Sequence, residues 1–115
     1  MRTTNVKMFD GYSMTSDGYS DPFNIELVTG FSIQATWTGT PTGYLFLQAS
    51  NDFPINQSNP TNWTLIDRSV HPTSGSSGDL IYKQHMAAYR WVRLGYAYGS
   101  GSGTLNARIS CKGTT

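Results

Sequence analysis

Alternation of apolar and polar positions is the clearest pattern in the chain, and it is strongest over residues 31–38. There Phe31, Ile33, Ala35 and Trp37 fall on one side of an extended backbone, while Ser, Gln and Thr fall on the other. Side chains of a strand alternate between the two faces of a sheet, so this segment is predicted to be a half-buried strand. A loop with two glycines and a proline follows, then a second apolar run at 44–50. The pair is predicted to form an antiparallel hairpin.

Similar strand signals recur along most of the chain, with turn-forming residues between them. They cover residues 5–9, 23–28, 31–38, 44–50, 62–68, 80–83, 89–98 and 104–112. The last two segments, joined by a Gly-Ser run, are predicted to form another hairpin. No window supports an amphipathic helix of useful length. The sequence therefore predicts an all-β fold, an antiparallel two-sheet sandwich of jelly-roll-like form with seven or eight short strands.

The first 21 residues differ from the rest because turn signals dominate them. The tetrapeptide DGYS occurs twice, at 10–13 and 17–20, and Asp-Gly pairs mark tight turns. We therefore expect residues 1–21 to form a loop-rich N-terminal arm and residues 22–115 to form the sandwich domain. An arm of this kind is expected to reach a neighbouring subunit, because mobile termini of small assembly proteins need an external anchor.

The composition indicates an uncharged polar surface. Ser, Thr, Asn and Gly make up 46 of the 115 residues, whereas charged residues make up 13% and the net charge is +1. That charge content is about half the usual share. Scattered basic residues do not form the positive stripe that phosphate backbones select, which argues against nucleic acid as a partner. A surface of hydroxyls and amides can dock onto a large assembly without burying unpaired ions.

Cys111 is the single cysteine, so the chain has neither an intrachain disulfide nor a cysteine zinc site. It alternates with Leu105, Ala107 and Ile109 on the apolar side of the last predicted strand, where a buried, inert thiol is expected. No run of 18 apolar residues and no apolar N-terminal segment is present. We therefore expect a chain made in the cytoplasm that does not span a membrane.

Residues suited to catalysis or metal binding do not form a recognisable pattern. His71 and His85 have no second histidine at metal-ligand spacing, and no serine lies in a G-x-S-x-G turn before a helix. Asp10, Asp17 and Asp21 could in principle gather a calcium ion, but their spacing does not match a calcium-binding loop. Turn formation explains the same aspartates. We expect no enzyme activity, no metal and no cofactor.

Aromatic residues offer a different kind of chemistry. In residues 89–98 one face carries Tyr89, Trp91, Arg93, Gly95 and Ala97, and the other carries Arg90, Val92, Leu94, Tyr96 and Tyr98. Exposed Trp or Tyr rings beside Arg and Asn are how β-sandwich modules bind sugars. Packing in the core and between the sheets explains most of the same residues. The arginine on each face is expected to lay its stem over an aromatic ring and so cap the edge of the core.

Three segments carry a resemblance to a known group of proteins. They read ATWTGTPTGYLFLQASND, NWTLID and YRWVRLGYAYGSGSGTLNARISCKG, and the match covers residues 31–113. Their order and spacing resemble small bacteriophage virion structural proteins, a β-sandwich group of head decoration, cement and fibre-type proteins. The resemblance implies a non-enzymatic virion protein, with a capsid decoration protein on the major capsid lattice favoured. It also implies a homo-oligomer, with a trimer favoured by analogy.

The predicted partners are the major capsid protein or other virion proteins, with neither nucleic acid nor membrane. Aromatic residues and prolines in the arm and loops are poorly explained by a core, so they are the predicted interface. These residues are Phe9, Tyr12, Tyr19, Phe53, Pro54, Pro60, His71 and Pro72. The alternative is a carbohydrate-binding module on a host-recognition fibre or tail component, with a surface glycan as its ligand.

Overall fold

The computed structural model describes residues 2–25, 28–51, 62–66, 68–85 and 90–113, and within these ranges it contains strands and no helix. The ten strands are β1 (Arg2–Ser13), β2 (Gly18–Tyr19), β3 (Phe23–Asn24), β4 (Val28–Gly39), β5 (Thr42–Ser50), β6 (Thr64–Leu65), β7 (His71–Pro72), β8 (Gly78–His85), β9 (Trp91–Ser100) and β10 (Gly103–Gly113). The prediction of an all-β chain is confirmed.

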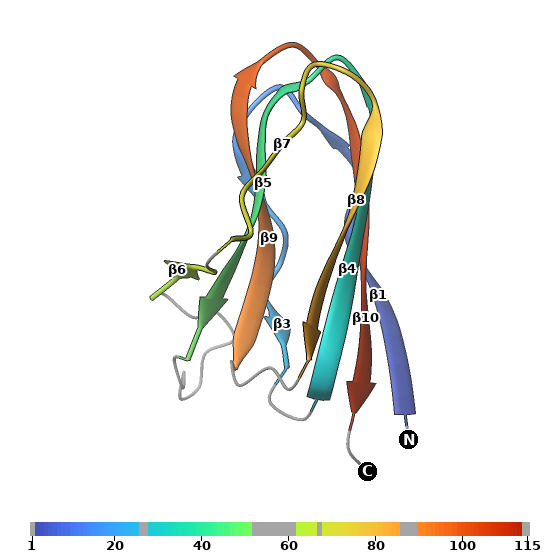
Figure 1. Cartoon of the computed structure of the whole chain (residues 1–115), viewed down its shortest axis with the longest axis vertical. Coiled ribbons are helices and arrows are strands. Elements are labelled where there is room, and N and C mark those ends of the chain that lie inside the picture. Colours follow the sequence, from blue (N-terminus) through green and yellow to red (C-terminus); the bar gives the residue numbers. More distant parts are fainter. Residues whose placement is uncertain (1, 26–27, 52–61, 67, 86–89, 114–115) are drawn as a thin grey trace.

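The strands form two antiparallel sheets packed face to face (Figure 1). Sheet A has the order β1-β10-β4-β8. In sheet B, β9 and β5 pair in the centre, β2 and β3 flank β9, and β6 and β7 flank β5. From β4 onward, long strands that follow one another in the chain lie in opposite sheets, and the order of strands is that of a jelly roll. The predicted two-sheet sandwich is therefore confirmed.

The core lies between the sheets and is made by alternating positions of the long strands. Sheet A contributes Phe9, Phe31, Ile33, Ala35, Trp37, Leu105, Ala107, Ile109 and Cys111, and sheet B contributes Leu45, Leu47, Ala49, Val92, Leu94 and Tyr96. Trp37 donates its indole N–H to the backbone oxygen of Ser76 at 2.8 Å, so this large ring is buried with its polar atom paired. Cys111 is a buried free thiol, as predicted, and burial raises its pKa.

Both predicted hairpins are wrong. β4 pairs with β10 and β8, and β5 pairs with β9, so each predicted partner lies in the opposite sheet. The connections β4 to β5 and β9 to β10 instead cross between the sheets side by side, where Thr40 N donates to Ser102 O at 2.8 Å. Two consecutive strands with apolar faces can pair beside each other or face each other across a core. Both arrangements bury every second residue, so the alternation in the sequence does not distinguish them.

The segment predicted as a loop-rich arm forms an edge of the sandwich. β1 pairs with β10 from Arg2 to Ser13, and Tyr19 in β2 pairs with Gly95 of β9. Two register shifts, between Lys7 and Phe9 and between Asp10 and Tyr12, break the period of two. These bulges explain why alternation predicted only residues 5–9 as a strand. Phe9 is buried in the core, so the expectation that it is exposed in an interface is wrong.

Candidate functional site

The outward face of sheet B is where aromatic side chains gather. In β5, Leu45, Leu47 and Ala49 are buried, which turns the alternate positions Tyr44, Phe46 and Gln48 away from the core. In β9 the same alternation buries Val92, Leu94 and Tyr96 and turns Arg93 and Ala97 outward. The two strands pair in register, with Gln48 opposite Arg93 and Phe46 opposite Gly95. A mixed aromatic and polar surface therefore follows the central strands of this sheet.

Gly95 allows two of these rings to meet over the backbone. Tyr19 lies on one side of Gly95 and Phe46 on the other, and their ring centroids are 6.1 Å apart in an edge-to-face arrangement. A Cβ atom at position 95 would come within 2.5 Å of the Phe46 ring and 3.1 Å of the Tyr19 ring. The absence of a side chain is thus what lets the rings approach each other.

Arg93 is held between two further ring faces. Its guanidinium carbon lies 4.0 Å from the centroid of the Tyr19 ring and 4.3 Å from that of Trp63, both within the range of cation–π attraction. Its Nε donates to Gln48 Oε1 at 2.8 Å. Burial lowers the pKa of Arg93, and the nearby Tyr19 opposes that shift. These contacts fix the position of the guanidinium in the middle of the surface.

We call Tyr19, Tyr44, Phe46, Trp63 and Arg93 the aromatic face. Tyr19 and Tyr44 are 50% and 52% exposed, so solvent reaches both rings. Toward the opposite edge of the sheet, Leu65 pairs with Gln48 and Pro72 pairs with Tyr44, and both are exposed. The face combines ring surfaces, an arginine and an amide. Such a set can stack on another ring and hydrogen-bond polar groups beside it.

The predicted interface residues are only partly brought together. Tyr19 and Pro72 lie at opposite edges of sheet B, and His71 is exposed next to Pro72. Tyr12 is half-buried against Phe9, with 4.9 Å between ring centroids, and donates its hydroxyl to Ser16 O at 2.8 Å. Phe53, Pro54 and Pro60 lie outside the described residues. Tyr44, Phe46 and Trp63 were not predicted as interface, although strict alternation in residues 44–50 could have indicated Tyr44 and Phe46.

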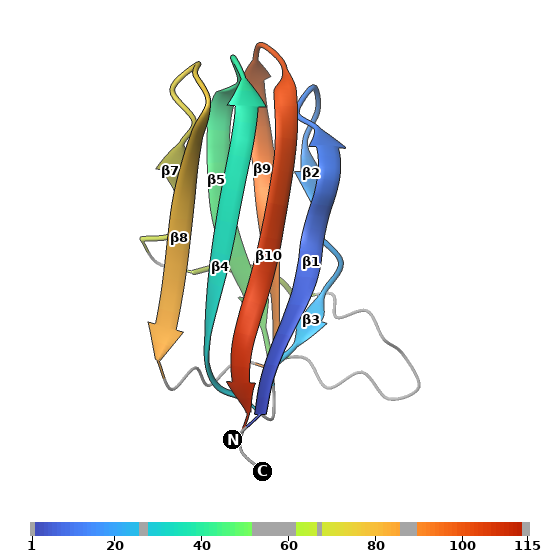
Figure 2. The ribbon, with the colours of Figure 1, turned by 90° about the vertical axis from the view of Figure 1, so that its right-hand side faces the viewer.

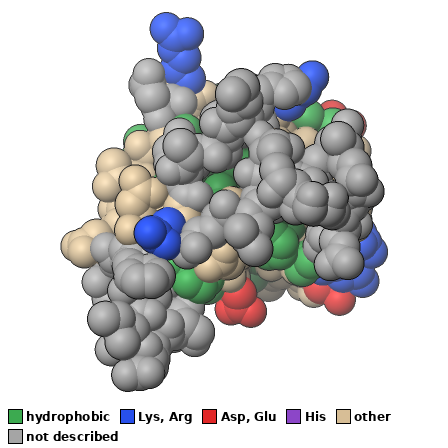
Figure 3. All heavy atoms as spheres, turned by 90° about the horizontal axis from the view of Figure 1, so that it is seen from below, with side chains coloured by type: hydrophobic (Ala, Val, Ile, Leu, Met, Phe, Trp, Pro, Cys, Tyr) green, Lys and Arg blue, Asp and Glu red, His purple; other side chains and the backbone are tan. Residues whose placement is uncertain are grey.

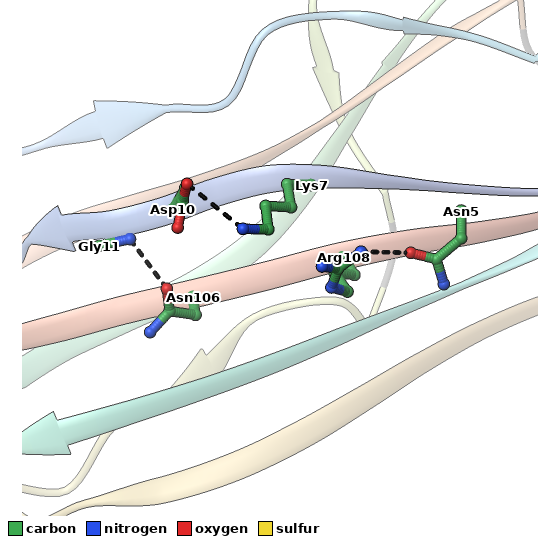
Figure 4. Close-up of polar contacts among 6 residues, drawn as sticks. All are labelled: Asn5, Lys7, Asp10, Gly11, Asn106 and Arg108. Atoms are coloured by element: carbon green, nitrogen blue, oxygen red, sulfur yellow. Dashed lines mark hydrogen bonds and ion pairs between the residues drawn. The ribbon is translucent and has the colours of Figure 1, made fainter.

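The outward face of sheet A has a different character, because its polar groups pair with one another (Figure 4). Arg108 donates to Asn5 Oδ1 at 2.7 Å, and the Gly11 N–H donates to Asn106 Oδ1 at 2.9 Å. Lys7 and Asp10 form an exposed ion pair at 3.5 Å, which contributes little stability. On this part of the surface, amide and charged groups bind one another.

At one end of the molecule, the charged side chains of the described residues do not form a visible patch either. From the end where β1 begins and β10 ends, the visible basic and acidic groups are scattered around the molecule (Figure 3). Asp17 accepts a hydrogen bond from the Tyr98 N–H at 2.7 Å, which ties the residue before β2 to β9. Within the described ranges, no three His, Cys, Asp or Glu side chains lie close enough to hold a metal ion. No helix in that part of the chain could cross a membrane.

Comparison with known proteins indicates the fold. No protein-family model and no curated protein matches the chain. Among solved structures, the crystal structure of the SPBc2 prophage-derived protein YomS is similar to it, with a TM-score of 0.57 and 13% sequence identity. The likeness covers 95% of this chain and 93% of that chain. Almost all of this chain therefore has a counterpart in a protein of nearly the same extent.

Proposed function

We propose that this chain is a non-enzymatic structural protein of a bacteriophage particle and that it decorates the major capsid lattice. The observation that carries the proposal is the likeness, over almost the whole of both chains, to a prophage-derived protein. The uncharged polar composition agrees with it, since such a surface can be covered by a neighbour without stranding charges. The sequence resemblance to virion proteins adds independent support for the same class.

The aromatic face is the part of the surface best suited to attachment. Tyr, Trp and Arg residues supply most of the binding energy in many interfaces, and here Tyr19, Trp63 and Arg93 are stacked on one another. Their positions are fixed before binding, which lowers the entropy lost on association. Many copies on one lattice would then add their individual contacts into a persistent attachment.

Quantitative mass spectrometry of purified particles tests the proposal directly. The measured quantity is the copy number of this chain relative to the major capsid protein. Decoration requires hundreds of copies per particle. A few dozen copies or fewer would contradict decoration and indicate a vertex, fibre or tail position, and absence from particles would reject a virion role altogether.

A second experiment tests the attachment surface. Tyr19→Ala and Phe46→Ala each remove one ring of the edge-to-face pair. When purified protein is added to particles that lack this chain, we expect less of either variant than of the native protein to bind. Val6→Ala is the matched control, because Val6 is also exposed and apolar but lies in β1 of sheet A, away from the aromatic face. Equal rebinding of all three variants would place the contact elsewhere.

The aromatic face also favours a second candidate function, carbohydrate binding on a host-recognition component. An exposed Tyr19 ring beside the Arg93 guanidinium and the Gln48 amide could stack on a pyranose and bond its hydroxyls. Titration with host polysaccharide, followed by tryptophan fluorescence, separates the two functions because Trp63 touches Arg93. Saturable quenching that Trp63→Phe abolishes would favour recognition, and an unchanged spectrum would favour the purely structural role.

A further inference from the structure

Strand β8 is the free edge of sheet A, and it is unlike the other edges of the molecule. Figure 2 shows β8 at one side of the sheet and β1 at the other. β1 is interrupted by two register shifts, and the edges of sheet B are the two-residue strands β2, β3, β6 and β7. Bulges and very short strands are how proteins prevent unwanted pairing at sheet edges. β8 has neither protection.

β8 is also regular along its length. It pairs with β4 from Gly78 to His85 without a register shift. Leu80 and Tyr82 pack against the core, so the alternate residues Asp79, Ile81 and Lys83 lie on the outward face. Ile81 is 60% exposed, the highest value among the exposed large apolar side chains of the described residues. Among the described strands, β8 has no partner on this side, so an exposed isoleucine at the middle of its regular edge is well placed to contact a further strand.

We propose that β8 pairs antiparallel with β8 of a second copy of this chain, about a two-fold axis at Ile81. In that register Ile81 lies opposite Ile81 of the other copy, and Leu80 lies opposite Tyr82. Asp79 then lies opposite Lys83, and Lys83 opposite Asp79, so each copy contributes to two ion pairs. The two A sheets join into one continuous eight-stranded sheet, because each contains four strands.

Charge complementarity is the reason for choosing a second copy as the partner. The positions of Asp79 and Lys83 are symmetric about Ile81, so self-pairing matches opposite charges, which favours a pair of strands. A shift by two residues would place Lys83 opposite Ile81 and lose both ion pairs. The charges thus select one register. The net charge of +1 adds almost no repulsion between copies.

Charge reversal tests this pairing on the purified chain, independently of any particle. Sedimentation velocity over a range of protein concentrations should show a dimer for the native chain. Lys83→Glu places two acidic residues opposite each other at both symmetric positions, and we expect dimerisation at least about tenfold weaker. The double variant Asp79→Lys with Lys83→Glu exchanges the charges and should restore it. Lys7→Glu, on the other edge of sheet A, is the matched control and should leave it unchanged.

A disulfide trap tests the position of the axis. Residues directly opposite in antiparallel strands have Cβ atoms about 4.5–5.5 Å apart, close enough for a disulfide after a small adjustment. Ile81→Cys should therefore form a covalent dimer under mild oxidation, whereas Lys7→Cys should not. The native Cys111 does not compete, because it is buried.

Three outcomes would overturn the proposal. They are a native chain that is monomeric at all concentrations, a native trimer, and a dimer that Lys83→Glu leaves intact. Because none of these measurements involves a phage particle, their failure would not affect the proposed virion role. Absence of the chain from particles would likewise leave the dimer unaffected.

Discussion

The half-buried Tyr82 and the buried Tyr96 show how single hydroxyl groups differ at the core. The Tyr82 hydroxyl donates to Ser69 O at 2.6 Å. This bond joins β8, the edge strand of sheet A, to the segment between β6 and β7. The Tyr96 hydroxyl is enclosed and makes no hydrogen bond of ordinary geometry. It lies near Thr73, whose Oγ1 already donates to Pro41 O and accepts from Gly43 N. The hydroxyl of Tyr82 is therefore paired, whereas that of Tyr96 is buried without a partner among the described residues.

This contrast predicts opposite effects of the same substitution. Tyr82→Phe removes a paired hydroxyl and leaves Ser69 O without that donor, so we expect the free energy of unfolding to fall by about 1 kcal/mol. Tyr96→Phe removes an unpaired buried hydroxyl, so stability should stay the same or rise by up to about 1 kcal/mol. Urea denaturation of the two variants measures both values. A larger loss for Tyr96→Phe would mean that its hydroxyl has a partner.

Burial also makes stability depend on alkaline pH. It raises the pKa of Tyr82 well above its ordinary value of 10.0, because the phenolate is poorly solvated inside the sandwich. The folded chain therefore holds this proton where the unfolded chain loses it. The contribution is present in full below pH 10.0 and declines as the pH rises above that value.

We therefore expect native stability to fall more steeply above about pH 10 than that of Tyr82→Phe. Tyr44→Phe is the matched control, because it removes an exposed hydroxyl from the same kind of residue. Chemical denaturation at a series of alkaline pH values measures the slopes. Parallel curves for the native chain and Tyr82→Phe would contradict the assignment.

The arrangement of rings in the aromatic face depends on one residue, Gly95. Gly95→Ala places a methyl group where the Phe46 and Tyr19 rings now lie, so at least one ring must move. Because the closest atoms belong to the far end of a side chain, we expect folding to survive and the edge-to-face pair to be lost. The near-UV circular dichroism of the aromatic side chains should change, while the far-UV spectrum should not. An unchanged near-UV spectrum would show that the pair tolerates a Cβ.

At the level of elements, the crossing loops at one end of the sandwich depend on glycine. Gly101 has a φ of 80°, and a Cβ there would lie 2.0 Å from Thr40 O of the adjacent loop. Gly11, in the bulged part of β1, has a similar φ of 73° but no atom within 4 Å of the same position. The two glycines thus share a backbone conformation and differ in available space.

Alanine substitutions at Gly11 and Gly101 should separate the free-energy cost of a left-handed backbone from the cost of a steric clash. Gly11→Ala is expected to lose about 1–2 kcal/mol, the cost of a left-handed backbone for a residue with a Cβ. Gly101→Ala adds a clash with backbone, which cannot rotate away, so its loss should be clearly larger. Thermal or urea unfolding of the two variants gives the comparison. Equal losses would show that the loop carrying Thr40 gives way freely.

The elements themselves were more predictable than their pairing. Strict alternation in β4, β5, β9 and β10 placed these strands correctly, because each is half-buried and regular. Their partners could not be deduced, because a strand's pattern shows which face is buried but not which sheet it joins. β1 was largely missed because its bulges shift the pattern, and β2 and β7 are too short to carry one.

For the whole molecule, the candidate site was visible only in part. Tyr19 and Pro72 were predicted as surface residues and do lie on sheet B. In the stack, Arg93 contacts Tyr19 and Trp63, which are 74 and 30 positions away in the sequence, so only the fold brings them together. The expected arginine over an aromatic ring is present. The two rings that Arg93 contacts come from β2 and from the segment before β6. No local sequence pattern indicated that these two segments would meet.

The low charge of the whole molecule makes a last prediction about attachment. If copies bind the capsid through the aromatic face and hydroxyl-rich surfaces, apolar and neutral polar contacts supply most of the affinity. Salt screens charge pairs strongly, to a Debye length of about 3 Å at 1 M, and barely weakens the other contacts. We therefore expect particles washed in about 1 M NaCl to keep this protein, because only 13% of its residues are charged.

The copy number per particle before and after the wash, determined by mass spectrometry, measures this. Particles carrying the Tyr19→Ala variant serve as the comparison. They should lose more protein than native particles at every salt concentration, because one ring of the contact is missing. Release of the native protein by salt alone would instead indicate attachment through the scattered charges, and the aromatic face would then not be the contact.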